Sequence, residues 1–341
     1  PTLKNIKPDL IMVSNTGYGH NGPFSNFGAM ATALEPTHGT GAFTGYLDST
    51  YDGHSIEGTV PNKIANSYTD FLASWTAQLA IMGSLIHRTK TGQGSWVDLA
   101  MYQVGTSFMG EGLLDYTFNQ TRSRRIGNRH EYFAPHGCFP CKGKDEWVVL
   151  AIRNDEEWKS FCNLLGKDNL AQDNRFKDPV SRHSNQDDLD PFIKEWTRQY
   201  KQTRVMEILQ NNGIPCGAVL NALGMLSDPN FRARGFFESV EHSPETGLGK
   251  REYVSRGWHL ESSDVTIRGQ APQMGEANDY VLRDILGLEE SDISYLDEKE
   301  AIGKQLSGAS IPSMVPLSRQ EELGWVAGYD PDYKEKLELD H

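Results

Sequence analysis

The pattern of apolar and polar residues predicts strands and helices that alternate along the chain. The apolar run DLIMVS at 9–14 predicts a buried strand, and the glycine-rich segment after it predicts a loop. The segment 66–94 gives the strongest helix signal, because its apolar residues recur at helical spacing and glycines end it. The run SWVDLAM at 95–101 predicts a second strand, and residues 102–116 predict a further helix.

The same alternation continues through the second half of the chain. WVVLAI at 147–152 and GIPCGAVLN at 213–221 predict strands, and residues 236–260 predict short strands around a turn-rich segment. Helices are predicted in the segments 154–166, 186–199 and 203–213 and again from residue 276 onward. Strands that alternate with helices predict an α/β architecture, with a mixed small domain inserted late in the sequence.

Polar segments separate these elements. Residues 42–61 are dominated by Gly, Thr, Ser, Asp and Pro and predict a long irregular connection, and LEPTHGTG at 34–41 predicts a turn. The stretch TFNQTRSRRIGNRH at 117–130 is polar and basic, and an aromatic-rich segment follows it. This shift in composition predicts a domain boundary.

The charge of the chain narrows the classes of function. The 341 residues carry a formal net charge of −13, so their field repels nucleic-acid backbones and anionic membrane surfaces. No apolar run approaches the roughly 18 residues of a membrane-spanning helix, and the first residues lack the apolar core of a signal peptide. We therefore expect a cytoplasmic protein with neither a nucleic-acid nor a membrane partner.

The cysteines predict neither a disulfide framework nor a metal site. Four cysteines are few for a chain of this length, and reduced thiols suit the cytoplasm. Cys138 and Cys141 make one C-x-x-C pair of the kind found in zinc sites and redox motifs, but no second pair and no histidine pair at ligand spacing accompany it. The simpler interpretation is that both thiols belong to an apolar strand.

Three glycines after the first predicted strand, Gly17, Gly19 and Gly22, have the G-x-G-x-x-G spacing of a dinucleotide-binding fingerprint. That fingerprint requires a helix that opens at the third glycine and an acidic residue about 20 positions later. Here Pro23 and poor helix formers follow the third glycine, and Glu35 lies in a predicted turn. This context favours a loop whose glycines permit tight turns over a dinucleotide site.

Longer segments carry a resemblance to a known family. They are PDLIMVSNTGYGHNGP, the helix and strand at 66–101, GNRHEYFAPHGCFPCKGKDEW, NNGIPCGAVLNALGMLSDPNFRARGFF and QMGEANDYVLRDILGL. In this order, and over nearly all of the chain, they resemble the family III CoA-transferases, which include formyl-CoA:oxalate and benzylsuccinate CoA-transferases and the related acyl-CoA racemases. The resemblance implies a large domain with a Rossmann-like parallel sheet that binds CoA, and a smaller α/β domain.

The resemblance implies that Asp70, at the start of the helix before the T-G-x-G turn at 91–94, is the catalytic group. In the implied mechanism its carboxylate attacks an acyl-CoA thioester to form a mixed anhydride, and CoA passes through an aspartyl-CoA thioester to an acceptor carboxylate. A second interpretation needs no catalysis, because Ser67 and Asp70 have the spacing of a capping box. Both can hold at once, since a helix amino terminus also suits a negatively charged nucleophile.

The resemblance also implies a loop over the active site and contacts to CoA. The residues that match the loop, and that include candidates to position substrate, are Gly127, Asn128, His130, His136 and Gly137. The residues expected near CoA are Gly17, Gly19 and Gly22 through their backbone, and Arg125 and Arg129 of the basic run with Arg122 and Arg124. A basic run is also typical of a solvated surface. The implied substrates are an acyl-CoA and a small carboxylic acid, with coenzyme A and no metal.

Two other functions remain open at this point. In the racemase branch a histidine in a G-H-D phrase acts with an aspartate as an acid/base pair, and this chain has Gly28-Ala29-Met30 there. Alanine cannot transfer a proton, so racemisation requires His20 or His38 to act from another position, and transfer is favoured. The second alternative is a non-catalytic subunit of a heteromeric CoA-transferase.

The resemblance further implies domains and partners. We expect a large CoA-binding domain in 1–110, a linker and active-site loop in 111–135, a small domain in 136–262, and a return segment in 263–341 that packs on the large domain. Family members have a mononucleotide-binding half before this sheet, and the chain begins at Pro1 within the sheet, so we expect that half to be absent or separate. We also expect an interlocked homodimer, or a hetero-oligomer with a related chain or with the missing half.

Overall fold

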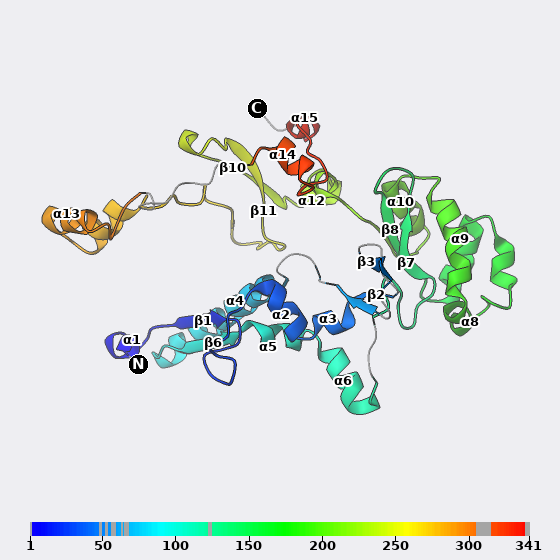
Figure 1. Ribbon diagram of the computed structural model, residues 1–341, viewed down its shortest axis with the longest axis horizontal. Helices are drawn as coiled ribbons and strands as arrows, with labels where there is room; N and C mark the ends of the chain where they lie inside the picture. Colours follow the sequence, from blue (N-terminus) through cyan, green and yellow to red (C-terminus); the bar gives the residue numbers. More distant parts are fainter. Residues whose placement is uncertain are drawn as a thin grey trace. The chain divides into compact units, whose positions relative to one another are not determined.

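The computed structural model describes residues 2–47, 50–51, 54–55, 59–62, 64, 68–121, 125–304 and 315–337 (Figure 1). Contacts divide the chain into two units, Pro1–Val219 and Leu220–His341. Helices and small sheets occur together, which confirms the mixed α/β class expected from the sequence. The domain boundaries expected at residues 110, 135 and 262 remain predictions.

The first unit contains a parallel pair of strands covered by a long helix. After α1 (Thr2–Ile6), β1 (Met12–Thr16) pairs in parallel with β6 (Trp96–Ala100). The helix α4 (Tyr68–Thr91) packs against both strands. These elements confirm the two strands and the long helix predicted in the first third of the chain. The small core between them is formed by Ala73, Leu99 and Val104.

A short helix, α2 (Ala31–Thr37), occupies the segment predicted as a turn, so that prediction is wrong. Pro36 lies inside α2 and gives the segment a poor local helix signal. Leu34 is buried, and α2 packs against α4. The burial of an apolar side chain therefore overrides the local signal.

The segment 42–61, predicted as an irregular connection, contains short strands, so that prediction is also wrong. It follows α3 (Thr40–Phe43) and its strands pair antiparallel. The pairs are β2 (Gly45–Leu47) with β5 (Thr59–Pro61), and β3 (Thr50–Tyr51) with β4 (His54–Ser55).

The segment predicted as one helix at 102–116 forms two, α5 (Met101–Ser107) and α6 (Gly110–Asn119). At the break, the Phe108 N–H donates to the Gly105 carbonyl, a tighter spacing than that of an α-helix. Glycines lie on both sides of the break, and glycine weakens helix propagation. The prediction that this segment is helical is therefore confirmed, and the prediction of one continuous helix is wrong.

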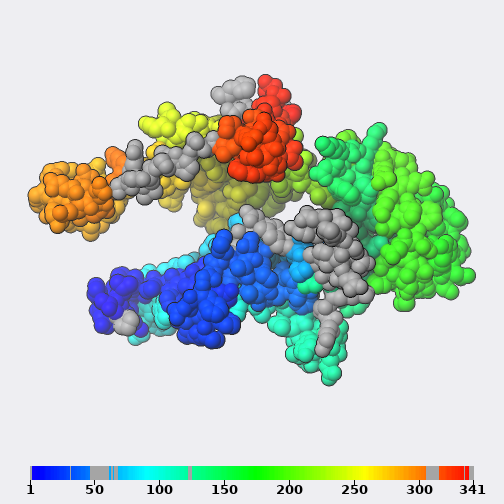
Figure 2. Space-filling model, viewed as in Figure 1, coloured from blue at the N-terminus to red at the C-terminus, as the bar shows by residue number. Residues whose placement is uncertain are grey.

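Three antiparallel strands and several helices form the second core of this unit. The strands, in the order β7-β8-β9, are β7 (His136–Pro140), β8 (Trp147–Ala151) and β9 (Cys216–Ala218). The helices are α7 (Asp155–Leu164), the 3-10 helix η1 (Asp168–Gln172), α8 (Pro179–Ser184), α9 (Gln186–Thr197) and α10 (Gln202–Asn211). Figure 2 shows this part of the chain as one compact green body, and Phe139, Trp158 and Phe161 are buried in its core. The strands and helices predicted here are confirmed.

The second unit is built from short elements. An antiparallel hairpin of β10 (Phe237–Glu241) and β11 (Lys250–Val254) confirms the short strands predicted at 236–260. The helices are α11 (Ala222–Leu226), α12 (Pro229–Ala233), the 3-10 helix η2 (Pro244–Thr246), the π-helix η3 (Tyr280–Ile285), α13 (Glu290–Glu298), α14 (Leu317–Glu322) and α15 (Tyr333–Lys336). Across the described residues of both units, no helix combines the length and apolar character needed to cross a membrane.

Candidate active site

Asp70 lies in the first turn of α4, at the carboxyl edge of the parallel strands. The far end of α4 leads to the start of β1, where the Gly94 N–H donates to the Pro8 carbonyl at 3.1 Å. The helix has 24 residues and rises about 36 Å, whereas a strand of 5 residues spans about 17 Å. The first turn of α4 therefore lies at or beyond the carboxyl ends of both strands, where open α/β sheets bind ligands.

The Asp70 carboxylate has no partner among the described residues and is partly exposed. Its side chain is half-buried, and within the described residues no hydrogen bond or ion pair involves its carboxylate. Its backbone carbonyl accepts from the Ser74 hydroxyl at 2.8 Å. Ser67, the partner expected in a capping box, lies outside the described residues. A carboxylate in this condition can attack an electrophile.

Backbone N–H groups of the glycine-rich loop after β1 already donate hydrogen bonds within the protein. Gly19 and Gly22 have φ values of 91° and 92°, which favour glycine. The Gly19 N–H donates to the Thr16 hydroxyl at 3.0 Å, and the His20 N–H donates to both carboxylate oxygens of Asp98 at 3.2 Å. An acidic side chain thus lies on the loop beside a cavity of about 200 Å³. The role of the loop near CoA stays a prediction.

Gly17, which directly follows β1, contacts two other segments of the chain. Its carbonyl accepts from the Tyr102 N–H of α5 at 3.1 Å. A Cβ atom at Gly17 would lie 2.2 Å from the Ala29 Cβ, so glycine is required by this close approach. The position expected to carry the histidine of a racemase therefore holds a methyl group packed against backbone.

The start of the predicted active-site loop is anchored on α3 and on the first residue of β2. Arg125 donates from Nε and Nη2 to the Gly41 carbonyl at 2.9 and 2.7 Å. The Gly127 N–H donates to the Gly45 carbonyl at 2.9 Å. Within the described residues, no hydrogen bond or ion pair links this loop to Asp70. The structure therefore fixes where the loop begins, and its contact with substrate stays a prediction.

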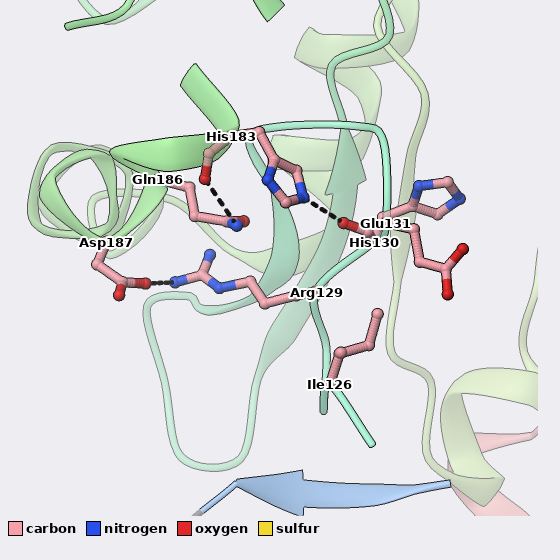
Figure 3. Close-up of a pocket in the computed structure, with 7 residues that line it drawn as sticks. All are labelled: Ile126, Arg129, His130, Glu131, His183, Gln186 and Asp187. Carbon is pink, nitrogen blue, oxygen red and sulfur yellow. Dashed lines mark hydrogen bonds and ion pairs between the residues drawn. The ribbon is translucent and has the colours of Figure 1, made fainter. Parts of the chain in front are cut away.

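Histidines hold the rest of the loop in place (Figure 3). The His183 Nε2–H donates to the His130 carbonyl at 3.0 Å, and the His136 Nδ1–H donates to the Asn128 carbonyl at 2.8 Å. His130 Nδ1 accepts from the backbone N–H groups two and three residues later, at 3.1 and 3.2 Å. Burial, and next the proximity of His136, lower the pKa of His130. The loop ends at Gly137, which is buried in β7.

Arg129 is engaged in ion pairs. Its guanidinium lies 2.7 Å from Asp187 and 3.0 Å from Asp190, beside a cavity of about 280 Å³ (Figure 3). The CoA contact expected of Arg129 stays a prediction. Arg122 and Arg124 lie outside the described residues.

Two buried residues, which the sequence analysis weighed only as a dinucleotide-binding acid (Glu35) and a racemase base (His38), contact the first turn of α4. Glu35 Oε1 accepts from the Tyr68 N–H at 3.0 Å, and His38 Nε2 lies 2.8 Å from the Thr69 hydroxyl. His38 Nδ1 lies 2.8 Å from the Thr40 hydroxyl, so both ring nitrogens are engaged within the protein. No local signal in the sequence pointed to these contacts, because their partners lie more than 30 positions away along the chain.

The four cysteines are free thiols; Cys138 lies in β7, as expected, whereas Cys141 directly follows that strand. Burial raises the pKa of Cys141 to about 11, and those of Cys162 and Cys216 to about 12. These thiols are therefore protonated at neutral pH. In the part of the chain that the structure describes, no three His, Cys, Asp or Glu side chains gather as ligands for a metal ion.

The described residues thus place Asp70, whose carboxylate has no hydrogen-bond or ion-pair partner among them, in the first turn of a helix at the carboxyl edge of two parallel strands. The family model of CoA-transferase family III matches residues 1–278. The chain belongs to this family, as expected from its sequence, and is an enzyme that transfers CoA.

Relatives of known activity support this assignment. A succinyl-CoA–D-citramalate CoA-transferase of Chloroflexus aurantiacus is 29% identical over 300 residues, which are 88% of this chain and 71% of that protein. A succinate–glutarate CoA-transferase of Agrobacterium fabrum is 24% identical over 289 residues, 84% of this chain and 68% of that protein. The alpha and beta subunits of a succinyl-CoA–L-malate CoA-transferase of Chloroflexus aurantiacus are 25% and 24% identical, over 89% and 88% of this chain and 64% and 71% of those proteins.

Solved structures share the fold. The crystal structure of a CaiB/BaiF family protein from Brucella suis is similar with a TM-score of 0.72 and 25% identity, over 83% of this chain and 70% of that chain. The crystal structure of Rv3272 from Mycobacterium tuberculosis is similar with a TM-score of 0.65 and 21% identity, over 82% of this chain and 70% of that chain. The likeness extends over both the parallel-strand region and the later sequence.

Proposed function

We propose that this chain transfers CoA from an acyl-CoA thioester to a carboxylic acid, with Asp70 as the covalent nucleophile. The observation that carries the proposal is the placement of Asp70, half-buried in the first turn of α4 with an unengaged carboxylate in the described part of the chain. The partial positive charge of a helix amino terminus stabilises negative charge on such a group. The position also matches the aspartate that the family resemblance assigns.

The proposed reaction proceeds through four acyl exchanges. An Asp70 carboxylate oxygen attacks the thioester carbonyl, the C–S bond breaks, and a mixed anhydride forms with release of CoA thiolate. The thiolate attacks the aspartyl carbonyl of the anhydride, which releases the donor acid and leaves an aspartyl-CoA thioester. The acceptor carboxylate then displaces CoA thiolate to form a second anhydride. The thiolate finally attacks the acceptor acyl carbon, which gives the new acyl-CoA and restores Asp70.

We propose a small carboxylic acid as the acceptor. The names of the relatives give succinyl-CoA as a donor for D-citramalate and L-malate, and pair succinate with glutarate. These acids share a short chain with two carboxyl groups. A first panel therefore contains succinyl-CoA as donor with citramalate, malate and glutarate as acceptors.

We propose that CoA lies at the carboxyl edge of the strands, between the glycine-rich loop and the loop at 127–137. Arg125 supports this placement, because its guanidinium donates to the Gly41 carbonyl of α3. The helix α3 packs against α2, and α2 packs against α4. The polar residues Asn128, His130 and His136 would position the substrate. His136 donates to the Asn128 carbonyl and His130 accepts from the Tyr132 N–H, so the loop is already folded and loses less entropy on closing over a ligand.

We propose that β1 and β6 belong to a Rossmann-like sheet in an interlocked homodimer or a complex with a related chain. An apolar stripe on α4 supports this assembly, because its side chains recur every three or four residues and are 56% to 75% exposed. An exposed stripe of this kind is typical of an interface. Its members are Phe71, Trp75, Leu79, Met82 and Ile86. A native mass that shows a monodisperse monomer would contradict the assembly.

The role of Asp70 is tested by Asp70→Ala, with Asp292→Ala as a matched control. Asp292 occupies the third position of α13, as Asp70 does in α4, so a purely capping acid would behave alike at both sites. We expect both variants to fold and to lose at most about 1 kcal/mol of stability. Asp70→Ala should lose CoA exchange and Asp292→Ala should keep it.

A trapping experiment complements the kinetics. Hydroxylamine added during turnover should convert an Asp70 anhydride or thioester into a hydroxamate, which mass spectrometry detects on the peptide that contains Asp70. The adduct should be absent without acyl-CoA. Retained exchange in Asp70→Ala would refute the nucleophile, and a wild-type chain that folds and assembles but exchanges no CoA would favour the non-catalytic subunit.

A further inference from the structure

Two buried polar side chains, from Glu35 of α2 and from His38 directly after that helix, hold the two residues that precede Asp70. Glu35 Oε1 accepts from the Tyr68 N–H at 3.0 Å, and His38 Nε2 lies 2.8 Å from the Thr69 hydroxyl. Glu35, His38 and Thr69 are 2%, 3% and 0% exposed. The first turn of α4 is therefore held by hydrogen bonds from another helix.

Stability alone does not account for a buried carboxylate at Glu35. Within the described residues its second carboxylate oxygen, Oε2, is buried without a hydrogen-bond partner. A buried polar atom in this condition lowers stability, and an apolar side chain of similar volume would avoid that loss. A role in placing the first turn of α4 accounts for a carboxylate at this position.

The His38 ring is fixed both in place and in the direction of its hydrogen bonds. The Thr40 hydroxyl donates to Met109 Sδ at 3.8 Å, so its oxygen accepts from His38 Nδ1–H and leaves Nε2 to accept from the Thr69 hydroxyl. Burial lowers the pKa of His38, which agrees with a neutral ring. On α5, a Cβ atom at Gly105 would lie 2.4 Å from the ring, so backbone closes that side.

We propose that Glu35 and His38 are positioning residues that fix the first turn of α4, so that the Asp70 carboxylate meets the thioester carbonyl in line for attack. The inference rests on the proposed role of Asp70 as nucleophile. Glu35 acts through the backbone of Tyr68, and His38 acts through the hydroxyl of Thr69. A misplacement of about 1 Å at a reacting group can lower a rate roughly 100-fold, so a rigid first turn has catalytic value.

The test compares substitutions that break these hydrogen bonds with substitutions that keep them. Thr69→Val removes the hydroxyl at nearly constant volume, and Thr69→Ser keeps it. Glu35→Asp keeps the charge on a side chain one methylene shorter, and Glu35→Gln keeps an acceptor oxygen within reach of Tyr68. We expect kcat to fall about 10- to 100-fold in Thr69→Val and Glu35→Asp, as is usual for lost supporting contacts, with KM unchanged.

The measurements are steady-state CoA exchange and the single-turnover rate of hydroxylamine trapping, on the full chain in its native assembly with succinyl-CoA as donor. Thr69→Ser and Glu35→Gln should stay close to the wild type in both. Folding is checked by circular dichroism, and if Thr69→Val does not fold, Glu35→Asp decides. A folded breaking variant with the kcat of the wild type, or with an effect confined to KM, overturns the positioning role.

Asp70→Ala separates this inference from the proposed function. Exchange that survives in Asp70→Ala removes the nucleophile, and the positioning role falls with it. Loss of exchange in Asp70→Ala, together with normal kcat in Thr69→Val and Glu35→Asp, keeps the nucleophile and rejects the positioning role alone. Loss in all three variants, with recovery in Thr69→Ser and Glu35→Gln, supports both.

Discussion

Gly105→Ala should destabilise the protein, although alanine is the better helix former. A Cβ atom there would lie 2.4 Å from two carbons of the His38 ring and 2.8 Å from its Nδ1, so the ring must move by roughly 1 Å to reach ordinary contact. Overpacking of a buried site costs about 1–3 kcal/mol. The hydrogen bonds of the ring to Thr40 and Thr69 contribute about 1 kcal/mol each if they break. The helix gains only about 1 kcal/mol from alanine, so with both hydrogen bonds broken we expect a net loss of about 2–4 kcal/mol.

Gly83→Ala provides the matched control. Gly83 lies within α4, and a Cβ atom there would meet nothing within 4 Å, so alanine should stabilise the chain by about 1 kcal/mol. Urea unfolding at pH 7.5 gives the free energy of unfolding of both variants against the wild type. If Gly105→Ala proves as stable as Gly83→Ala, the packing argument is refuted. A stable Gly105→Ala would also contradict the argument that the backbone at Gly105 holds the His38 ring in place.

Three further results are expected. DTNB should label the native thiols slowly, because burial raises the pKa of each. The half-buried Cys138 should react first, and the other three thiols should react only after denaturant unfolds the chain. Rapid labelling of Cys162 in the native protein would contradict this prediction. Arg182→Leu should cost at least about 2 kcal/mol in urea unfolding, because Arg182 is buried and donates to the carbonyls of Ala134 and Phe176; a loss below 0.5 kcal/mol, roughly that of a surface change, would refute the reasoning. Burial lowers the pKa of His38 below 6.5, so the stability that its neutral ring contributes should be lost as the pH falls from about 6.5 through that lower pKa. Between pH 8 and pH 5, the free energy of unfolding in urea should fall less for His38→Gln than for the wild type. Equal falls in the two proteins would reject this prediction.

The elements around Asp70 were predictable because their signals are local. The strands and α4 each carry their own periodicity, and glycines mark the end of the helix. The role of Asp70 was not predictable in this way. An acid three positions after Ser67 fits a helix cap and a nucleophile equally well, so the resemblance of the flanking segments had to decide between them.

The support for Asp70 could not be predicted, because its partners are distant in sequence. Glu35 and Tyr68 are 33 positions apart, and His38 and Thr69 are 31 apart. Their contact depends on the packing of α2 against α4, whereas the local pattern around Pro36 indicates a turn. Periodicity has the same limit on α4 itself, since it predicts a helix without predicting which apolar side chains stay exposed.

Capping and catalysis make opposite demands on one carboxylate in the first turn of α4. A capping acid uses its oxygens to accept from backbone N–H groups, whereas a nucleophile needs an oxygen lone pair that is free to attack. Four N–H groups at a helix start lack partners within the helix, and Glu35 satisfies that of Tyr68 from outside. The Asp70 carboxylate is left unengaged in the described part of the chain. If Asp70 is the nucleophile that we propose, this division of roles accounts for a glutamate that is buried beside an aspartate in a capping position.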